Sequence, residues 1–355
     1  MSTPKFASPA ISLNAELKKR VNEYFKVHNL PSTGNGSLYL KAAVLILGYL
    51  FIYVHLVFFT PAAWVAIPEC MLLGLLTAGI GFNVMHDGAH GSFSKNQKVN
   101  LAAAYTLDFL GASSFMWNTK HNIVHHAYTN IDGVDDDIEA GMMLRMAPQQ
   151  KRYRFHKYQH IYFWALYGLL YIAWVFYTDY KKYFSNKVGS VPLKKLKRID
   201  HILFWAFKAL HLCSFVILPI VMVGVWPWLI GFLVYTASSG IILSLVFQLA
   251  HVIEETSFPE AVQPANRMDD EWAVHQLKTT ANFATRNKFI TWWVGGLNFQ
   301  IEHHLFPRVS HIHYPTISRI VKKACADMKV PYIEHYTMLK AITSHKAHLK
   351  LMGAA

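Results

Sequence analysis

The sequence predicts an all-α integral membrane protein: four transmembrane helices in two hairpins, interfacial helices, and a cytoplasmic helical cap that carries a dimetal site. Of its 355 residues, 53% are hydrophobic and 15% are charged, whereas about a quarter of the residues in soluble domains are charged. The apolar residues form runs of about twenty, the length that crosses a bilayer. Three short histidine clusters stand next to such runs. We expect a cytoplasmic segment at 1–41, a membrane domain at 42–330 and a cytoplasmic tail at 331–355.

The first hairpin is predicted at residues 42–60 and 63–85, which are joined by a short uncharged link. Basic residues precede the first run, so the positive-inside rule places the N-terminus in the cytoplasm. The hairpin then returns the chain to the cytoplasmic side at His86. The second hairpin is predicted at 202–225 and 229–250, and it returns His251 to the same side.

Two further apolar stretches are predicted to lie in the membrane interface. Residues 100–117 separate two histidine clusters; if both clusters serve one site, this segment cannot cross once and is too short to cross twice. We expect an amphipathic helix there. Between His126 and His251 the number of crossings must be even, so 161–178 is expected to be interfacial or re-entrant. The mostly polar residues 255–355 are expected to form the cap, with both termini cytoplasmic.

Charge and cysteine content exclude other classes of function. The net charge of +13 is not accompanied by a nucleic-acid-binding motif, so we expect no nucleic acid and attribute the charge to cytoplasmic loops and anionic lipid. The three cysteines are far apart and form no CxxC pattern, which argues against a zinc-thiolate site. Arg152, Arg154 and Lys157 form a basic group that either faces lipid phosphates or binds a coenzyme A or phospholipid headgroup.

The three histidine clusters of the sequence, called boxes below, are the candidate metal-binding residues. They read HDGAH at 86–90, HNIVHH at 121–126 and QIEHH at 300–304. Neutral imidazole is the commonest protein metal ligand. Residues four apart share a helix face, so His121 and His125 are expected to face one metal region, with His126 turned about 100° away.

Seven histidines in three sets exceed the needs of one ion, so we expect two metals. His251, just past the last span, is the eighth candidate, and Gln300 is a weak or water-mediated one. Redox-active iron is favoured, and copper or zinc remains open. A single HxxxH is more often structural, but three sets on one predicted side favour a site. Asp87, Asn130 and Asp137 are expected to support the ligands through hydrogen bonds.

At these residues the sequence resembles the membrane fatty acid desaturases. The likeness extends into the flanks, which read GAHGSFS at 88–94, HHAYTN at 125–130 and FQIEHHLFP at 299–307, and it covers roughly residues 40–330. The resemblance implies two irons, O2 as co-substrate, two external electrons, and a cis double bond formed in an acyl chain carried by coenzyme A or a lipid. It implies no catalytic residues beyond the metal ligands, which it maps onto His86, His90, His121, His125, His126, His251, His303 and His304.

Two positions depart from the general pattern of that family. Gln248 stands near the place of an asparagine that acts through water, so Gln248 is a candidate substitute. Gln300 replaces the first histidine of the third box. In this respect the sequence resembles the front-end subgroup of the family, whose members insert a double bond between an existing double bond and the carboxyl end of the chain.

Many front-end members carry a fused cytochrome b5 domain with an HPGG motif, which this sequence lacks. We therefore expect a separate ferredoxin or cytochrome b5, with its reductase, as electron donor. The expected location is the inner membrane if the protein is bacterial and the endoplasmic reticulum if it is eukaryotic.

Two alternatives stay open at this point. A fatty acyl or sphingolipid hydroxylase uses the same boxes. A non-enzymatic haem-binding or metal-transport membrane protein is a lower-ranked alternative, for which the mid-span His55 and His211 are the only candidate haem ligands.

Overall fold

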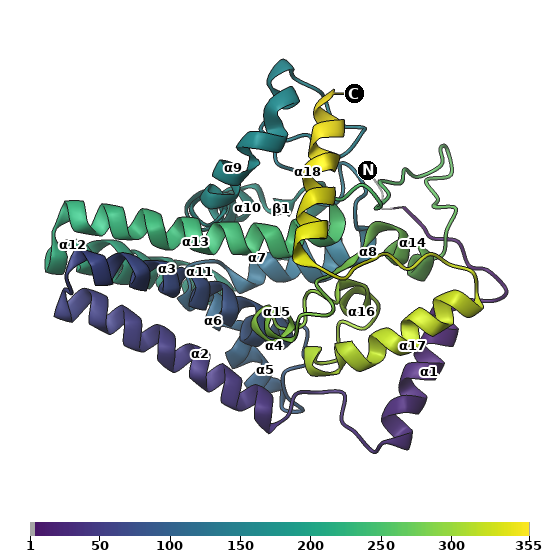
Figure 1. The fold of residues 1–355 in the computed structure, drawn as a ribbon, viewed down its shortest axis with the longest axis horizontal. Coiled ribbons are helices and arrows are strands. Elements are labelled where there is room, and N and C mark those ends of the chain that lie inside the picture. Colours follow the sequence, from purple (N-terminus) through teal and green to yellow (C-terminus); the bar gives the residue numbers. More distant parts are fainter. Residues whose placement is uncertain (1–3, 355) are drawn as a thin grey trace.

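The computed structural model describes residues 4–354, and helices make up most of it (Figure 1). The longer helices are α1 (Leu13–Val27), α2 (Gly36–Val54), α3 (Ala63–Ile80), α9 (Gln159–Ala173), α11 (Arg198–Leu212), α13 (Val225–His251), α17 (Tyr314–Asp327) and α18 (Met338–Ala354). The shorter ones are α4 (His86–Ala89), α5 (Gln97–Ala104), α6 (Thr106–Phe109), α7 (Ser114–Asn118), α8 (His126–Tyr128), α10 (Asp179–Ser185), α12 (Leu218–Val223), α14 (Trp272–Thr279), α15 (Lys288–Trp293) and α16 (Gln300–Leu305).

Short helical turns of other types interrupt or extend these helices. The π-helical turns are η1 (His55–Phe59), η2 (Gly81–Met85), η3 (Thr119–His125), η5 (Trp174–Thr178) and η6 (Cys213–Ile217). The 3-10 turns are η4 (Arg154–Tyr158) and η7 (His311–His313). Strands β1 (Lys187–Val188) and β2 (Val191–Pro192) pair antiparallel, and β3 (Asn282–Phe283) and β4 (Glu334–His335) pair parallel.

Within residues 4–354, five continuous helical stretches are long and apolar enough to cross a membrane. They are Gly36–Phe59, Ala63–Ala89, Arg154–Ser185, Arg198–Val223 and Val225–His251. Figure 1 shows α2, α3, α11 and α13 running side by side, with the turn into α3 and the turn into α13 at the same end. The chain is therefore a helical membrane protein, and its expected hairpins are present as helix pairs.

Helix α13 lies at the centre of this bundle because small residues let its neighbours approach closely. A Cβ atom added at Gly74 of α3 would lie 2.4 Å from the carbonyl oxygen of Tyr235. On the other side, a Cβ at Gly240 would lie 2.5 Å from the carbonyl oxygen of Tyr167 in α9. Small residues at such crossings are typical of helix pairs in membranes. The end of α13 at His251 is thereby held in a fixed position.

Two local expectations about the helices are wrong. The second hairpin breaks at Gly224, whose φ is +86°, and Pro227 lies in the first turn of α13 rather than in the link. Proline fits a first turn because the backbone N–H that it lacks would be unpaired there. Residues 100–117 are not one amphipathic helix. They lie in α5, α6 and α7; Tyr105 is the C-cap of α5, and a turn at Gly111 with φ +100° separates α6 from α7.

The polar C-terminal third folds over the end of the bundle together with the N-terminal helix. Helices α1, α14, α16 and α17 share an apolar core that includes Leu17, Leu277, Ile301 and Ile317. Helix α18 packs on α9, where the Tyr167 hydroxyl lies 2.6 Å from Nε2 of His345. This cap holds α16, and with it the third histidine box, against the other two boxes.

Candidate metal centre

The eight predicted histidines converge where the bundle meets the cap. His86 and His90 come from α4 and its end, His121 and His125 from η3, His126 from α8, His251 from the end of α13, and His303 and His304 from α16. All of them except His90, which is partly exposed, are buried.

One cluster brings together His86, His90, His121 and His303, with a ring nitrogen of each within 4.8 Å of the others. The Nε2 atom of His121 lies 3.3 Å from Nε2 of His86 and 3.4 Å from Nε2 of His303. Two imidazole nitrogens that bind one tetrahedral ion at about 2.1 Å are about 3.4 Å apart. The spacing in this cluster therefore fits ligands of a shared metal ion.

A second cluster contains His125, His251 and His304, again with nitrogens within 4.8 Å of one another. His126 lies between the clusters: its Nε2 is 3.2 Å from Nε2 of His121, and its ring centroid is 4.5 Å from that of His304. The eight rings thus form two adjacent groups, as a two-metal site requires.

The position of His126 corrects the expectation that it points away from His121. Residues 119–125 form a π-helical turn rather than an α-helix. This wider turn brings residues five positions apart closer to one face than an α-helix does. Such turns occur frequently at functional sites. Another π-helical turn, η2, directly precedes His86.

In and beside the two clusters, several buried polar atoms have no hydrogen-bond partner among the described residues. These atoms are Nε2 of His90, Nδ1 of His126, Nε2 of His304, Oε1 of Gln300 and Oε1 of Gln248. An unsatisfied buried donor or acceptor costs about 1–3 kcal/mol, and coordination to a metal ion would remove that cost for the imidazole nitrogens. The residues present therefore fit bound metal ions.

Electrostatics keep most of these rings in the form that binds a metal. Burial lowers the pKa of His90, His121, His126, His303 and His304 well below the ordinary histidine value, and neighbouring imidazoles lower it further. At neutral pH these rings are uncharged. For His125 burial acts in the same direction, but Asp135 and Asp137 outweigh it and raise the pKa.

In several of these histidines, the ring nitrogen Nδ1 contacts a residue that was not predicted from the sequence. Nδ1 of His304 lies 2.8 Å from Oε1 of Gln276, and Nδ1 of His303 lies 3.2 Å from the Tyr314 hydroxyl. Nδ1 of His251 lies 3.2 Å from the carbonyl oxygen of Thr279. Such contacts fix ring orientation and strengthen ligands. Gln276 and Tyr314 belong to no motif in the sequence.

Asp87, Asn130 and Asp137, which were expected to support the metal ligands through hydrogen bonds, make three different kinds of contact. Asp137 lies 3.3 Å from Nδ1 of His125 and pairs with Lys120 at 2.5 Å. Asn130 donates to the carbonyl oxygens of His251 at 2.8 Å and Thr279 at 3.4 Å, so it holds the backbone beneath His251.

Within the described part of the chain, Asp87 forms no hydrogen bond or ion pair with a box histidine. Its Oδ2 accepts a hydrogen bond from the Ser310 hydroxyl at 2.7 Å and lies 3.0 Å from Nδ1 of His311.

The other predicted residues lie around the centre or away from it. Gln300 is buried at the start of α16, and Gln248 donates to the carbonyl oxygen of Asp137 at 3.2 Å. The basic group lies on the surface: Arg154 and Lys157 are exposed, and Arg152 donates to the carbonyl oxygen of Gly353 at 2.9 Å. Its role as a headgroup site stays a prediction.

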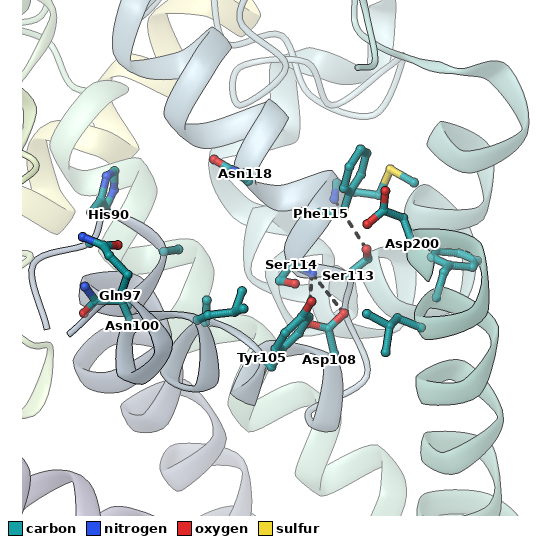
Figure 2. Close-up of a pocket in the computed structure, with 18 of the residues that line it drawn as sticks. His90, Gln97, Asn100, Tyr105, Asp108, Ser113, Ser114, Phe115, Asn118 and Asp200 are labelled. Carbon is teal, nitrogen blue, oxygen red and sulfur yellow. Dashed lines mark hydrogen bonds between the residues drawn. The ribbon is translucent and has the colours of Figure 1, made fainter. Parts of the chain in front are cut away.

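Two cavities reach the histidines from different sides. One is a cavity of mixed polarity, about 720 Å³ in volume. Figure 2 shows His90, Tyr105, Asp108 and Asp200 among the residues that line it. A small apolar cavity of about 30 Å³ adjoins His86 and is lined by Gly81, Leu107, Phe247 and other bundle residues. The centre is thus adjoined by an apolar space within the bundle and by a larger cavity whose wall includes charged residues.

Comparison with known proteins agrees with this arrangement. The sequence pattern of the fatty acid desaturase family matches residues 62–336. The chain is 37% identical to an sn-1 linoleoyl-lipid 6-desaturase of Arthrospira platensis, over 97% of this chain and 93% of the relative. It is 36% identical to an acyl-lipid (8-3)-desaturase of Physcomitrium patens, over 95% of this chain and 71% of that relative. With its histidine clusters, the chain belongs to the fatty acid desaturase family and is an oxidoreductase of that family.

Proposed function

We propose that the protein is an O2-dependent desaturase that forms a cis double bond in a fatty acyl chain carried by a lipid or by coenzyme A, using two iron ions held by the eight histidines. The two adjacent clusters with unpartnered buried nitrogens carry this proposal. When bound, iron would supply the oxygen activation that attack on an unactivated C–H bond needs. Gln300 and Gln248 are proposed to contact the ions weakly or through water.

The chain's own residues would place the acyl chain and exclude water. The apolar cavity beside His86 is bounded by Leu107, Leu110, Leu243 and Phe247. An alkyl chain gains free energy by leaving water for such a wall. At about 30 Å³ the cavity holds only a small part of an acyl chain, so the remainder would have to displace the surrounding side chains; the part bound there would present a methylene pair to the first histidine cluster. Burial of the surrounding imidazoles keeps bulk water away from the reacting carbons.

The position of the double bond is proposed to be near the carboxyl end of the chain. Relatives from Arthrospira platensis and Synechocystis are named sn-1 linoleoyl-lipid 6-desaturases, and each is 37% identical to this chain. Gln300 at the start of the third box agrees with that class. A lipid-borne acyl chain is therefore the favoured substrate.

The membrane topology is proposed to consist of four spans with both termini and the histidines on the cytoplasmic side. Helices α2, α3, the α11–α12 pair and α13 would cross, and the fifth apolar stretch, Arg154–Ser185, would lie in the interface. Three stretches between His126 and His251 are long and apolar enough to cross. Because both histidines belong to one site, the number of crossings between them has to be even, so one of the three is proposed not to cross. Electrons would come from a separate ferredoxin or cytochrome b5 with its reductase. The membrane would be the inner membrane of a bacterium or, in a eukaryote, the endoplasmic reticulum.

Expression in a host that lacks the product, followed by mass spectrometry of the lipids, tests the function. The wild type is expected to form a new double bond, and H304A is expected to abolish it. H28A, a change at an exposed histidine outside the clusters, is the matched control and should retain activity. A hydroxy-acyl product without an olefin would instead identify a hydroxylase. Metal analysis should give about two irons per chain, and a haem absorption band would refute the assignment.

A further inference from the structure

A second cleft of about 720 Å³ lies between the beginning of α2, α15 and α17, on elements that do not supply box histidines. We call it the basic cleft. It is lined by five cationic side chains: Lys41, Arg286, Lys288, Arg319 and Lys322. Among its described lining residues, one carboxylate, that of Glu334, faces them and pairs with Lys322 at 2.5 Å. The cleft therefore has an excess of positive charge.

Lys41 lies at the inner end of the basic cleft and is only 9% exposed. Its Nζ lies 3.4 Å from Nε2 of His311 and 5.1 Å from the centroid of the Trp292 ring. Among residues 4–354, no carboxylate forms an ion pair with this ammonium group; Asp87, which pairs with His311, attracts it from a longer distance. A buried charge without a directly paired counter-ion is costly. An anion bound in the cleft would offset that cost.

The surroundings of the basic cleft favour a lipid over a soluble acidic protein. Large apolar side chains beside it are exposed: Leu40 and Val44 on α2 are 68% and 55% exposed, and Phe289 and Trp292 on α15 are 69% and 44% exposed. Helix α2 begins one of the apolar stretches long enough to cross a membrane. In Figure 1, α15 and the beginning of α17 lie near the first turns of α2. Cations and exposed aromatic rings thus meet at the level where headgroups lie.

We propose that the basic cleft binds the phosphate of an anionic phospholipid headgroup. Lys41 provides a buried positive charge at its inner end, while Arg286, Lys288 and Arg319 surround the opening. Basic pockets between membrane helices bind anionic headgroups in this way. The exposed apolar side chains beside the cleft accommodate the first part of the acyl chains. The site differs from the surface group of Arg152, Arg154 and Lys157, and the bound lipid need not be the one that is oxidised.

The test compares three charge-neutralising variants of the full-length protein purified in detergent. R286Q/K288Q/R319Q changes three exposed cations of the cleft. K18Q/K19Q/K26Q makes the same change in charge on exposed residues of α1, and R152Q/R154Q/K157Q makes it at the other basic group. Calorimetry measures binding of a short-chain phosphatidylglycerol, the matched diacylglycerol and inorganic phosphate. Melting temperatures confirm that each variant is folded.

We expect the wild type to bind phosphatidylglycerol and not diacylglycerol, and the cleft variant to bind it about tenfold or more weakly. The other two variants should stay within about twofold of the wild type. Unchanged binding by the cleft variant would overturn the proposal. If inorganic phosphate bound as tightly as the lipid, the cleft would be a site for free anions, and this result would also overturn the proposal.

A slower reduction by an acidic electron-carrier protein, with lipid binding unchanged, would identify a protein-docking surface instead and overturn the proposal. Because calorimetry requires no turnover, failure of the desaturase assignment leaves this result intact. Conversely, loss of lipid binding would not alter the product test of the proposed function.

Discussion

The Nδ1 atom of His125 lies 3.0 Å from Oδ2 of Asp135, and both side chains are almost completely buried. This pair joins the second histidine box to the three consecutive aspartates at 135–137 that follow it. Asp135 also accepts hydrogen bonds from the backbone N–H groups of Asn130 and Asp137, so its carboxylate is fixed by the loop it orders. The loop therefore determines how the His125 ring faces the second cluster.

D135N is expected to lower metal affinity about 10-fold, because His125 loses the charge of the nearer of the two carboxylates that orient its ring. D132N, in the same loop but not hydrogen-bonded to His125 in the structure, is the matched control. Metal content after dialysis against a graded series of chelator concentrations measures the change. Equal metal retention by the two variants would show that Asp135 does not position the ligand.

The metal-free protein is expected to lose stability as pH falls below about 6.5. Burial lowers the pKa of His303 and His304 well below the ordinary histidine value of 6.5. Below 6.5 the unfolded chain therefore binds protons that the folded chain does not, and protonation favours unfolding. Melting temperatures of the metal-free protein between pH 5 and pH 8 measure the effect. In H303Q/H304Q the slope should be smaller, and a slope equal to that of the wild type contradicts the assignment.

Titration of Glu302 changes the stability of the protein with pH in the opposite direction. Burial raises its pKa from 4.5 to about 8, although Asn282 and Tyr332 donate hydrogen bonds to it. The stability that its protonated form contributes is complete below pH 4.5 and is lost as pH rises through about 8. E302Q removes this titration, so its melting temperature should fall less than that of the wild type between pH 6 and pH 9. E260Q, at an exposed glutamate, should follow the wild type, and identical curves for E302Q and the wild type would exclude a raised pKa.

G81L is expected to block the apolar cavity beside His86. A Cβ built at Gly81 meets nothing within 4 Å, so the backbone accepts a side chain that then fills the cavity. Activity on long acyl chains should fall about tenfold or more, since hydrophobic pockets discriminate by single methylenes at that level. Metal content should be unchanged. A43L, on the exposed face of α2, is the control, and full activity of G81L would show that the acyl chain takes another path.

The sequence was sufficient to recognise the family and the apolar helices, because hydrophobic periodicity and motif spacing are local properties; the metal-ligand role of the boxes and of His251 stays a prediction. The sequence was not sufficient for the partners of those histidines. Three consecutive aspartates follow the second box, and only the tertiary loop shows that Asp135 makes the 3.0 Å contact with His125. Gln276 and Tyr314 reach the third box from the cap through packing. The position of His126 also escaped prediction, because a π-helical turn has no reliable sequence signal.

The π-helical turn at 119–125 makes the second histidine box sensitive to the loss of a single residue. Removing Ile123, whose side chain is 53% exposed, would take away a single residue that contributes little to the core. The remaining residues would tend to wind as an ordinary α-helix, and every later ring in the box would rotate relative to His121. The loss of one codon here would therefore change which imidazole meets which ion.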